Sequence, residues 1–246
     1  MPRAQRGRAR RRTIDQPRLI SFRALRRINA DGAYANLVTQ ELTGGLAARD
    51  AGFVIELVHG TCRWQGTYDR VIQAASGRGL DTLQPAVVDV LRLACHQLFA
   101  MRIPVHAAVA ASVDLAGVAI AERVTGVVNA IVRRLAARDL AGWLDELAHG
   151  LPADAELALR HAHPEWVVDA LADALASDTA ELEQLLVANN TPPVPMLAVR
   201  PGLAEVAELV AAGAEPARWS PWAASRAGNP SELAAVREGR AGVQDE

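Results

Sequence analysis

Apolar residues recur at helical spacing through most of the first 138 residues. The first predicted helix carries, three residues apart, Leu19, Phe22, Leu25 and Ile28. This period predicts an amphipathic helix that starts at Pro17 and stops at Asp31-Gly32. Further helices are predicted over 34–42, from 50 to the turn at 76–79, from 85 to the break at Ile103-Pro104, over 104–117 and over 120–138. The short connections indicate a compact antiparallel bundle.

The pattern changes after residue 139. Acidic helices are predicted at 142–149, 154–162, 164–176 and 178–189, and the prolines of Thr191–Pro195 then interrupt the helical run. A strand at 196–200, a helix at 203–212, a strand at 218–223 and a helical turn at 231–237 complete the pattern. We therefore expect a mainly α protein that ends in the start of a small α+β unit, too short to close a sheet on its own.

Charge divides the chain at the same place. All 26 basic residues are arginine. Residues 1–138 hold 20 Arg and 10 acidic residues, a net of +10, whereas residues 139–246 hold 6 Arg and 18 acidic residues, a net of −12. A basic module favours a polyanionic partner, with nucleic acid the leading candidate. The alternative is that arginine only decorates solvated helix faces.

Several classes of protein find no support in the sequence. The N-terminal residues MPRAQRGRARRR precede no apolar segment of the kind found in secretory signals, and no apolar run is long enough to span a membrane. Cys62 and Cys95 lie in apolar helical patterns and form no metal-binding spacing, which fits buried thiols in a reducing cytoplasm.

Catalytic motifs are also missing from the sequence. It contains no phosphate-binding glycine loop, HExxH or GxSxG. His106, His161 and His163 have no partner at an informative spacing. On motifs alone the chain is predicted to be a binding module, with no catalytic residue, cofactor site or metal site of its own.

Six blocks, in order, resemble the RsmB-type (Fmu/Sun) family of ribosomal RNA cytosine-5 methyltransferases. They are ELVHGTCRWQGTYDRVI (Glu56–Ile72), LACHQLFAMRIPVHAAV (Leu93–Val109), VNAIVRRL (Val128–Leu135), HPEWVV (His163–Val168), ANNTPPVPMLAVR (Ala188–Arg200) and GVQDE (Gly242–Glu246). In the first block the family pattern E-L-x-x-G-x-x-R…D falls on Glu56, Leu57, Gly60, Arg63 and Asp69.

The resemblance implies a domain plan. Residues 17–140 would form an RNA-binding bundle that resembles NusB, the antitermination factor, residues 141–190 linker helices, and residues 191–246 the beginning of an RRM-like subdomain. The family's next domain binds S-adenosylmethionine and carries two catalytic cysteines, and the motifs of that domain do not occur here. We therefore expect residues 1–246 to bind and orient 16S ribosomal RNA without transferring a methyl group, with the catalytic domain, and a ribosomal protein, as further partners.

Arginine suits RNA because its planar guanidinium binds phosphate with two hydrogen bonds and stacks on bases. Residues 1–16 form an Arg-rich tail that we expect to be disordered in isolation. The predicted RNA-binding residues lie in this tail, on the first helix and on the bundle: Arg3, Arg6, Arg8, Arg10, Arg11, Arg12, Arg18, Arg23, Arg26, Arg27, Arg63, Arg70, Arg133 and Arg134.

Two other functions remain open at this stage. The bundle would also fit a stand-alone NusB-like antitermination factor that binds RNA with a ribosomal protein, and the blocks after residue 160 argue against that function. A helical protein-interaction module, with the tail as a solubilising appendage, is the other. For the C-terminal part we expect low stability, and apolar surface exposed near Met196–Val199 and Trp219–Trp222.

Overall fold

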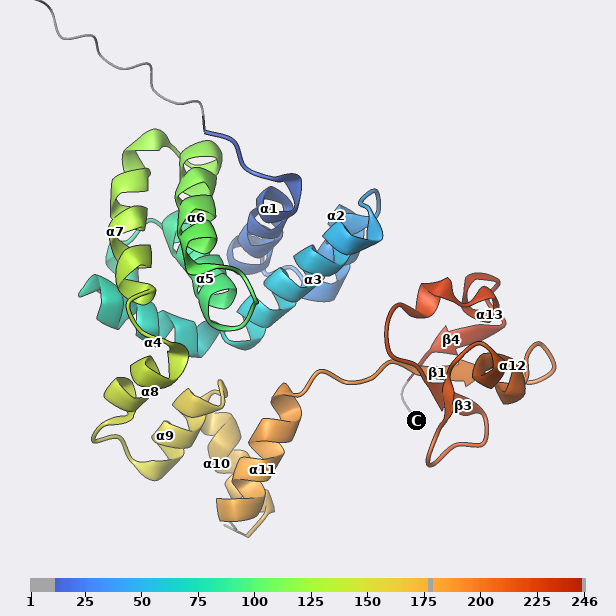
Figure 1. The fold of residues 1–246 in the computed structure, drawn as a ribbon. Coiled ribbons are helices and arrows are strands. Elements are labelled where there is room, and N and C mark those ends of the chain that lie inside the picture. Colours follow the sequence, from blue (N-terminus) through green and yellow to red (C-terminus); the bar gives the residue numbers. More distant parts are fainter. Residues whose placement is uncertain (1–11, 177–178, 245–246) are drawn as a thin grey trace, which may run out of the picture. The chain divides into compact units, whose positions relative to one another are not determined.

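A computed structural model describes residues 12–176 and 179–244 (Figure 1). The chain divides into two units, Met1–Val187 and Ala188–Glu246, and each is described by itself. The first unit contains α1 (Gln16–Asp31), α2 (Ala35–Thr43), α3 (Ala48–Arg63), α4 (Gln65–Ser76), α5 (Pro85–Phe99), α6 (Val105–Ala119), α7 (Thr125–Leu135), α8 (Leu140–Ala148), α9 (Ala153–Arg160), α10 (Glu165–Ala174) and most of α11 (Thr179–Asn190), with 3-10 turns at Leu80–Thr82 and Glu122–Val124.

Local sequence explains where α1 begins and ends. The Asp15 carboxylate accepts a hydrogen bond from the Arg18 backbone N–H, so it caps the first turn, and Pro17 occupies a position where no backbone donor is needed. Gly32 ends the helix with φ +67°, a left-handed conformation that glycine adopts without steric cost. Residues 12–15, which we had placed in the disordered tail, are described here, and Ile14 packs against the bundle core.

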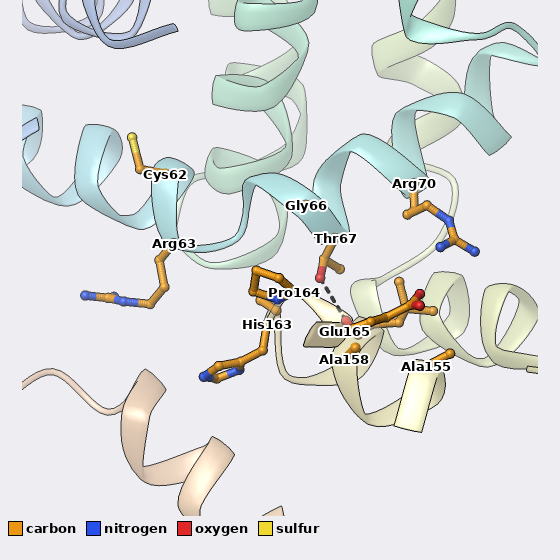
Figure 2. Close-up of a pocket in the computed structure, with 12 residues that line it drawn as sticks. Cys62, Arg63, Gly66, Thr67, Arg70, Ala155, Ala158, His163, Pro164 and Glu165 are labelled. Carbon is orange, nitrogen blue, oxygen red and sulfur yellow. Dashed lines mark hydrogen bonds between the residues drawn. The ribbon is translucent and has the colours of Figure 1, made fainter. Parts of the chain in front are cut away.

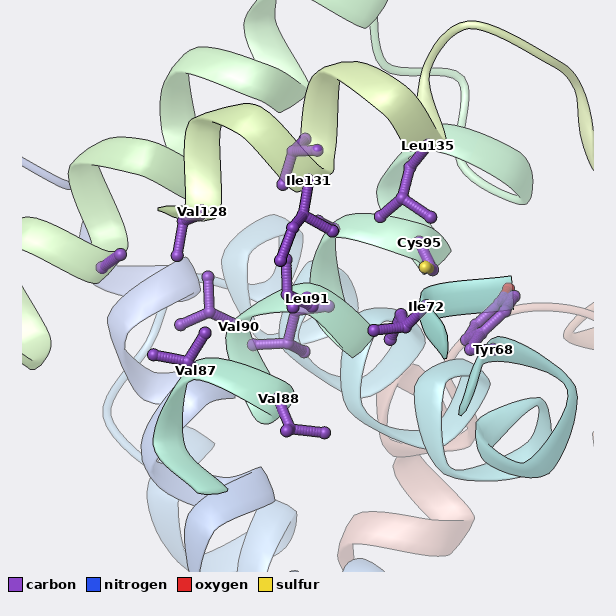
Figure 3. Close-up of a cluster of buried hydrophobic side chains, with 14 of the residues drawn as sticks. Tyr68, Ile72, Val87, Val88, Val90, Leu91, Cys95, Val128, Ile131 and Leu135 are labelled. Carbon is purple, nitrogen blue, oxygen red and sulfur yellow. The ribbon is translucent and has the colours of Figure 1, made fainter. Parts of the chain in front are cut away.

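The core of the first unit surrounds α5. Figure 3 shows Val87, Val90 and Leu91 of α5 packed among side chains from α4 and α7. Since α5 is buried on nearly all sides, it lies at the centre of the bundle. Trp143 of α8 belongs to the same cluster, and its indole Nε1 donates a hydrogen bond to the Leu135 carbonyl at 3.1 Å. The bundle therefore extends beyond the boundary at residue 140 that we had predicted.

One predicted helix is two. The expected helix from residue 50 to the turn at 76–79 breaks at Trp64, whose φ of −96° and ψ of 6° are not helical. Trp64 stacks on Tyr68 of α4 with ring centroids 6.1 Å apart. The change of direction lets α4 pack against α7 and α8, while α3 packs against α1 and α5.

The second unit forms a complete sheet of its own, although we had predicted that it would be too short to do so. It contains β1 (Met196–Val199), α12 (Val206–Ala211), β2 (Glu215–Pro216), β3 (Ala223–Ser225), a 3-10 turn at Pro230–Glu232, α13 (Ala234–Arg237) and β4 (Ala241–Val243). The strands form an antiparallel sheet in the order β2-β3-β1-β4. This βαββαβ connectivity is that of the ferredoxin-like fold. The sheet forms although each of its strands has only two to four residues.

The core of the second unit corrects one exposure that we had predicted. Leu197 and Val199 of β1 are buried against Leu209 of α12 and Ala235 of α13. The predicted exposure at the other segment is confirmed, because Trp219 is 72% and Trp222 51% exposed. Of the strand predicted at 218–223, residues 218–222 instead belong to the connection between β2 and β3, and β3 begins at Ala223.

Candidate nucleic-acid interface

Most arginines of α1 are held by carboxylates. Arg18 contacts Asp15 at 2.6 Å and the amide oxygen of Gln97 at 2.7 Å, and its guanidinium lies 5.0 Å from the centre of the Phe53 ring. Arg26 binds Asp89 at 2.7 Å, and Arg27 binds Glu41 through two hydrogen bonds of 2.9 Å. Arg23 is exposed and has no carboxylate partner among the described residues.

Arg12 is bound to α6 and to the 3-10 turn that precedes α7. Its guanidinium donates to Asp114 at 2.7 Å and to both carboxylate oxygens of Glu122, at 2.9 and 3.0 Å. The hydrogen bonds from Arg12 lower the pKa of Glu122. The Arg12 side chain lies across Gly117 of α6, where a Cβ would be 2.5 Å from the Arg12 Cδ. We call this set of contacts the Arg12 clasp.

Two exposed arginines, Arg63 and Arg70, line a groove of about 380 Å³ at the junction of α3 and α4. The opposite wall comes from α9, from His163 in the loop that follows it and from Glu165 at the start of α10 (Figure 2). Neither arginine forms an ion pair with any described residue. The groove therefore offers two guanidinium groups to an anionic ligand.

Hydrogen bonds hold the two walls of this groove together. The buried Thr67 hydroxyl donates to the Leu159 carbonyl at 2.8 Å, which ties α4 to α9. His163 donates from Nδ1 to the His161 carbonyl at 2.6 Å, so its ring orientation is set by the loop before α10. Burial raises the pKa of the Cys62 thiol to about 11, so this thiol is protonated at neutral pH and is a poor nucleophile there.

A second groove, of about 500 Å³, lies between α6 and α7. Its floor is apolar, with Val109 and Val113, and its rim carries Arg12, His106 and Arg133. Arg133 is exposed and has no carboxylate partner among the described residues, whereas Arg134 donates to the Ala75 carbonyl at 3.2 Å. The two adjacent arginines of α7 therefore face different surroundings.

Other polar residues in and around the first two blocks have structural roles. His96 is buried and contacts the Tyr68 hydroxyl at 3.1 Å and Glu56 at 3.2 Å. Gly60 makes room for it, because a Cβ there would lie 2.1 Å from the imidazole ring. Asp69 accepts two hydrogen bonds of 2.7 Å from Arg92.

Within the described ranges, no three His, Cys, Asp or Glu side chains gather closely enough to hold a metal ion. Among the helices that the structure describes, none is long and apolar enough to cross a membrane.

The NusB family model matches residues 15–137, half of the chain. The chain belongs to the NusB family. Its NusB domain contains α1 to α7, and the relatives extend the match further. A Mycobacterium tuberculosis protein named "Putative methyltransferase" is 42% identical over 243 residues, which cover 96% of this chain and 53% of that protein. The ribosomal RNA small subunit methyltransferase B of Pseudomonas putida is 30% identical over 183 residues, which cover 74% of this chain and 40% of the enzyme.

The chain thus spans about half the length of the curated relatives it matches. Among solved structures, that of PH0851 superimposes with a TM-score of 0.64 at 16% identity, over 96% of this chain and 54% of that one. This likeness shows the fold, in which a NusB domain is followed by further helices and a small sheet.

The predicted RNA-binding arginines therefore fall into four groups. Arg3, Arg6, Arg8, Arg10 and Arg11 lie outside the described residues. Arg12, Arg18, Arg26 and Arg27 are bound to carboxylates, while Arg23, Arg63, Arg70 and Arg133 are exposed and unpaired within the described part of the chain. Arg134 is exposed but directed to a backbone carbonyl. His106 and Asn129, which we had not placed in any binding surface, both line the α6–α7 groove with Arg133.

Proposed function

We propose that this chain is the RNA-binding portion of an S-adenosylmethionine-dependent ribosomal RNA cytosine-5 methyltransferase that acts on 16S RNA in the cytoplasm. The observation that carries the proposal is the similarity to ribosomal RNA small subunit methyltransferase B over 183 residues, more than the NusB domain contains. The 243-residue match to the mycobacterial relative takes in the α+β unit as well. A stand-alone antitermination factor would need only the NusB domain.

The unpaired arginines supply the physical basis for binding RNA. A guanidinium already bound to a carboxylate must give up that contact before it binds phosphate, whereas an exposed and unpaired one need not. Arg63, Arg70 and Arg133 meet this condition on the bundle. Together with the arginines of residues 1–11 they would neutralise phosphates irrespective of base sequence, so they give affinity and orientation rather than a preference for cytosine.

The residues described here do not fit S-adenosylmethionine. Nucleotide-type cofactors bind where glycine-rich turns follow the carboxyl ends of parallel strands. The sheet of this chain is antiparallel with very short strands, and the turn after β1 holds a single glycine, Gly202. We assign no step of methyl transfer to these residues. The catalytic domain of the whole enzyme, and a ribosomal protein where one assists, would be partners of this chain.

The dependence of RNA affinity on salt tests the proposal. If Arg63 and Arg70 each contact one phosphate of a single strand, their joint replacement by alanine should flatten the plot of log affinity against log salt by about 1.4. At physiological salt the affinity should drop on the order of tenfold. The matched control is Arg160→Ala/Arg240→Ala, which removes the same charge from arginines already paired with carboxylates.

Equal slopes for the two double variants would exclude the α3–α4 groove as a contact surface. A second measurement addresses catalysis. The purified chain, given 16S RNA and labelled S-adenosylmethionine, should leave the RNA unlabelled, and labelled RNA would overturn the assignment of this chain to binding alone.

A further inference from the structure

The α3–α4 groove carries charges of both signs. Arg63 and Arg70 lie on one wall, and the Glu165 carboxylate lies on the other. Glu165 is exposed, and it forms no ion pair with any basic residue in the described part of the chain. Figure 2 shows the two guanidinium groups extending toward opposite ends of the groove, with Glu165 between them. The groove therefore presents two cations and one anion that do not neutralise one another.

Hydrogen bonds and packing fix the start of α10, and with it Glu165, relative to the arginines. The hydrogen bond described above ties α9 to α4. After α9 the chain turns at Ala162, which has a left-handed φ of +55°, and the next N–H, that of His163, donates to the Ala158 carbonyl at 3.0 Å. Ala158 and Val168 belong to one apolar cluster, so α10 packs on α9. The two walls of the groove thus form one continuous structure.

A ligand that uses all three charged groups has to offer negative charge as well as hydrogen-bond donors. An RNA strand supplies the negative charge, because each phosphate can bind a guanidinium. A carboxylate only accepts hydrogen bonds, so the donors have to be N–H groups of a base. The Watson–Crick edge that carries them is accessible in an unpaired nucleotide.

Guanine matches a carboxylate better than the other bases do. Its Watson–Crick edge presents two neighbouring donors, N1–H and N2–H, which face the two oxygens of a carboxylate. Cytosine and adenine each present one amino group beside an acceptor nitrogen. Uracil presents its N3–H between two carbonyl oxygens, which a carboxylate repels.

The groove also has the space and the aromatic surface that a nucleotide needs. Gly66 lies between the two arginines in the sequence and is exposed, and a Cβ built there meets no atom within 4 Å, so the α4 backbone is open to a ligand. The volume of about 380 Å³ falls in the usual range of small-molecule sites. Trp166, the residue after Glu165, is 72% exposed, so the first turn of α10 also offers an indole on which a base can stack.

We propose that the α3–α4 groove binds an unpaired guanine of the RNA, with Glu165 accepting hydrogen bonds from its N1–H and N2–H groups while Arg63 and Arg70 hold the phosphates on either side. This inference rests on the proposed function and adds base selectivity to it. The arginines alone attract any strand. Discrimination therefore falls to Glu165, whose negative charge opposes a base that gives it no donors.

Short RNAs that differ at one base test the inference. Fluorescence anisotropy with labelled UUUGUUU, UUUIUUU and UUUUUUU compares guanine with inosine, which lacks the N2 amino group, and with uracil. We expect the full chain to bind the guanine heptamer about five- to tenfold more tightly than the uracil heptamer, with the inosine heptamer in between. The ratios are compared because arginines elsewhere on the chain bind the phosphates of all three RNAs alike.

Three variants separate the base contact from the phosphate contacts. Glu165→Gln should reduce the guanine-to-uracil ratio to less than about twofold, without weakening the uracil heptamer, because a negative charge is removed. Asp173→Asn removes an exposed carboxylate from the same helix outside the groove, so this matched control should keep the ratio. Arg63→Ala/Arg70→Ala should weaken all three heptamers by a similar factor.

Equal affinities of the wild-type chain for the three heptamers, or a ratio that survives Glu165→Gln, would overturn the inference and leave the proposed function standing. Binding of 16S RNA without binding of any heptamer would have the same consequence. A chain that binds neither the heptamers nor 16S RNA would overturn both.

Discussion

Replacing Gly60 by alanine should destabilise the NusB domain, although the same change at Gly52 in the same helix should stabilise it. A Cβ at position 60 would lie 2.1 Å from the buried His96 ring, whereas a Cβ at position 52 meets no atom within 4 Å. The two positions therefore share the helical preference for alanine and differ in what surrounds them.

The magnitude follows from three contributions. Forcing a side chain into a packed core costs about 1–3 kcal/mol. Displacing His96 also costs its hydrogen bond to Tyr68, a contact worth about 1 kcal/mol. Alanine in a helix is favoured over glycine by about 1 kcal/mol. Gly60→Ala should thus lower the free energy of unfolding by about 2 kcal/mol, or about 6 °C in melting temperature for a unit of this size, and Gly52→Ala should raise it by about 0.5–1 kcal/mol.

Urea denaturation followed by circular dichroism at the helical band measures these differences, since most of the helix lies in the first unit. The decisive control is Gly60→Ala in a His96→Ala background. Because the obstructing ring is gone there, the alanine should cost nothing relative to His96→Ala alone. Equal stabilities of the Gly60→Ala and Gly52→Ala proteins would refute the proposed contact between α3 and His96.

Three further predictions concern buried groups. Burial lowers the pKa of His96 and of His59 below the ordinary 6.5. Because the unfolded chain therefore binds protons at these histidines more tightly, the free energy of unfolding should decrease as the pH falls below 6.5. In His96→Gln, the free energy of unfolding measured by urea denaturation at several pH values should depend less steeply on pH, and an unchanged dependence would contradict this. Burial raises the pKa of the Cys62 thiol to about 11. Alkylation of Cys62 by iodoacetamide near neutral pH, followed by peptide mass spectrometry, should therefore be on the order of a hundredfold slower than in the unfolded chain. Equal rates in the folded and unfolded chains would show an accessible thiolate. Asp89 is 1% exposed and accepts hydrogen bonds from Arg26, Asn29 and Arg92. Asp89→Ala should therefore lower the free energy of unfolding, measured by urea denaturation, by about 3–5 kcal/mol. A smaller loss than that caused by removing an exposed pair such as Arg27–Glu41 would show that the arginines find other partners.

The helices could be predicted from the sequence because their signals are local. The confirmed mainly α fold follows from periodicity over a few turns, and the ends of α1 follow from Asp15 and Gly32 in its immediate neighbourhood. The break at Trp64 had no such signal, since no proline or glycine stands at that position. It results from tertiary packing of α4 on α7 and α8, which periodicity does not contain.

The sheet of the second unit could not be predicted for a related reason. Its strands have two to four residues and are rich in alanine, and β1 pairs with β3 and β4, which follow it by more than 20 residues. Strands this short carry no alternation that can be recognised along the chain. The pairing energy comes from partners that are distant in sequence, so the sheet's existence depends on the whole unit.

Contacts between residues that are distant in sequence also decide which arginines are paired, and the sequence does not reveal them. Composition correctly indicated a basic first half, but not which guanidinium groups are already paired. Asp15 lies three residues from Arg18 and could be anticipated, whereas the partners of Arg26 and Arg12 lie 63 and more than 100 residues away. The availability of an arginine to a ligand is therefore a property of the fold, and only the structure separates Arg63 and Arg70 from the paired set.

The indole hydrogen bond of Trp143 to Leu135 bears on where this protein can be divided. Truncation after α7, at the end of the NusB match, would remove a tryptophan from the main core, and it would leave the buried Thr67 hydroxyl without its acceptor on α9. The truncation would leave an apolar hole in the core and an unsatisfied donor on α4. We therefore expect the smallest fragment that keeps the bundle intact to include α8 and α9, because both helices supply contacts to the core of the basic domain.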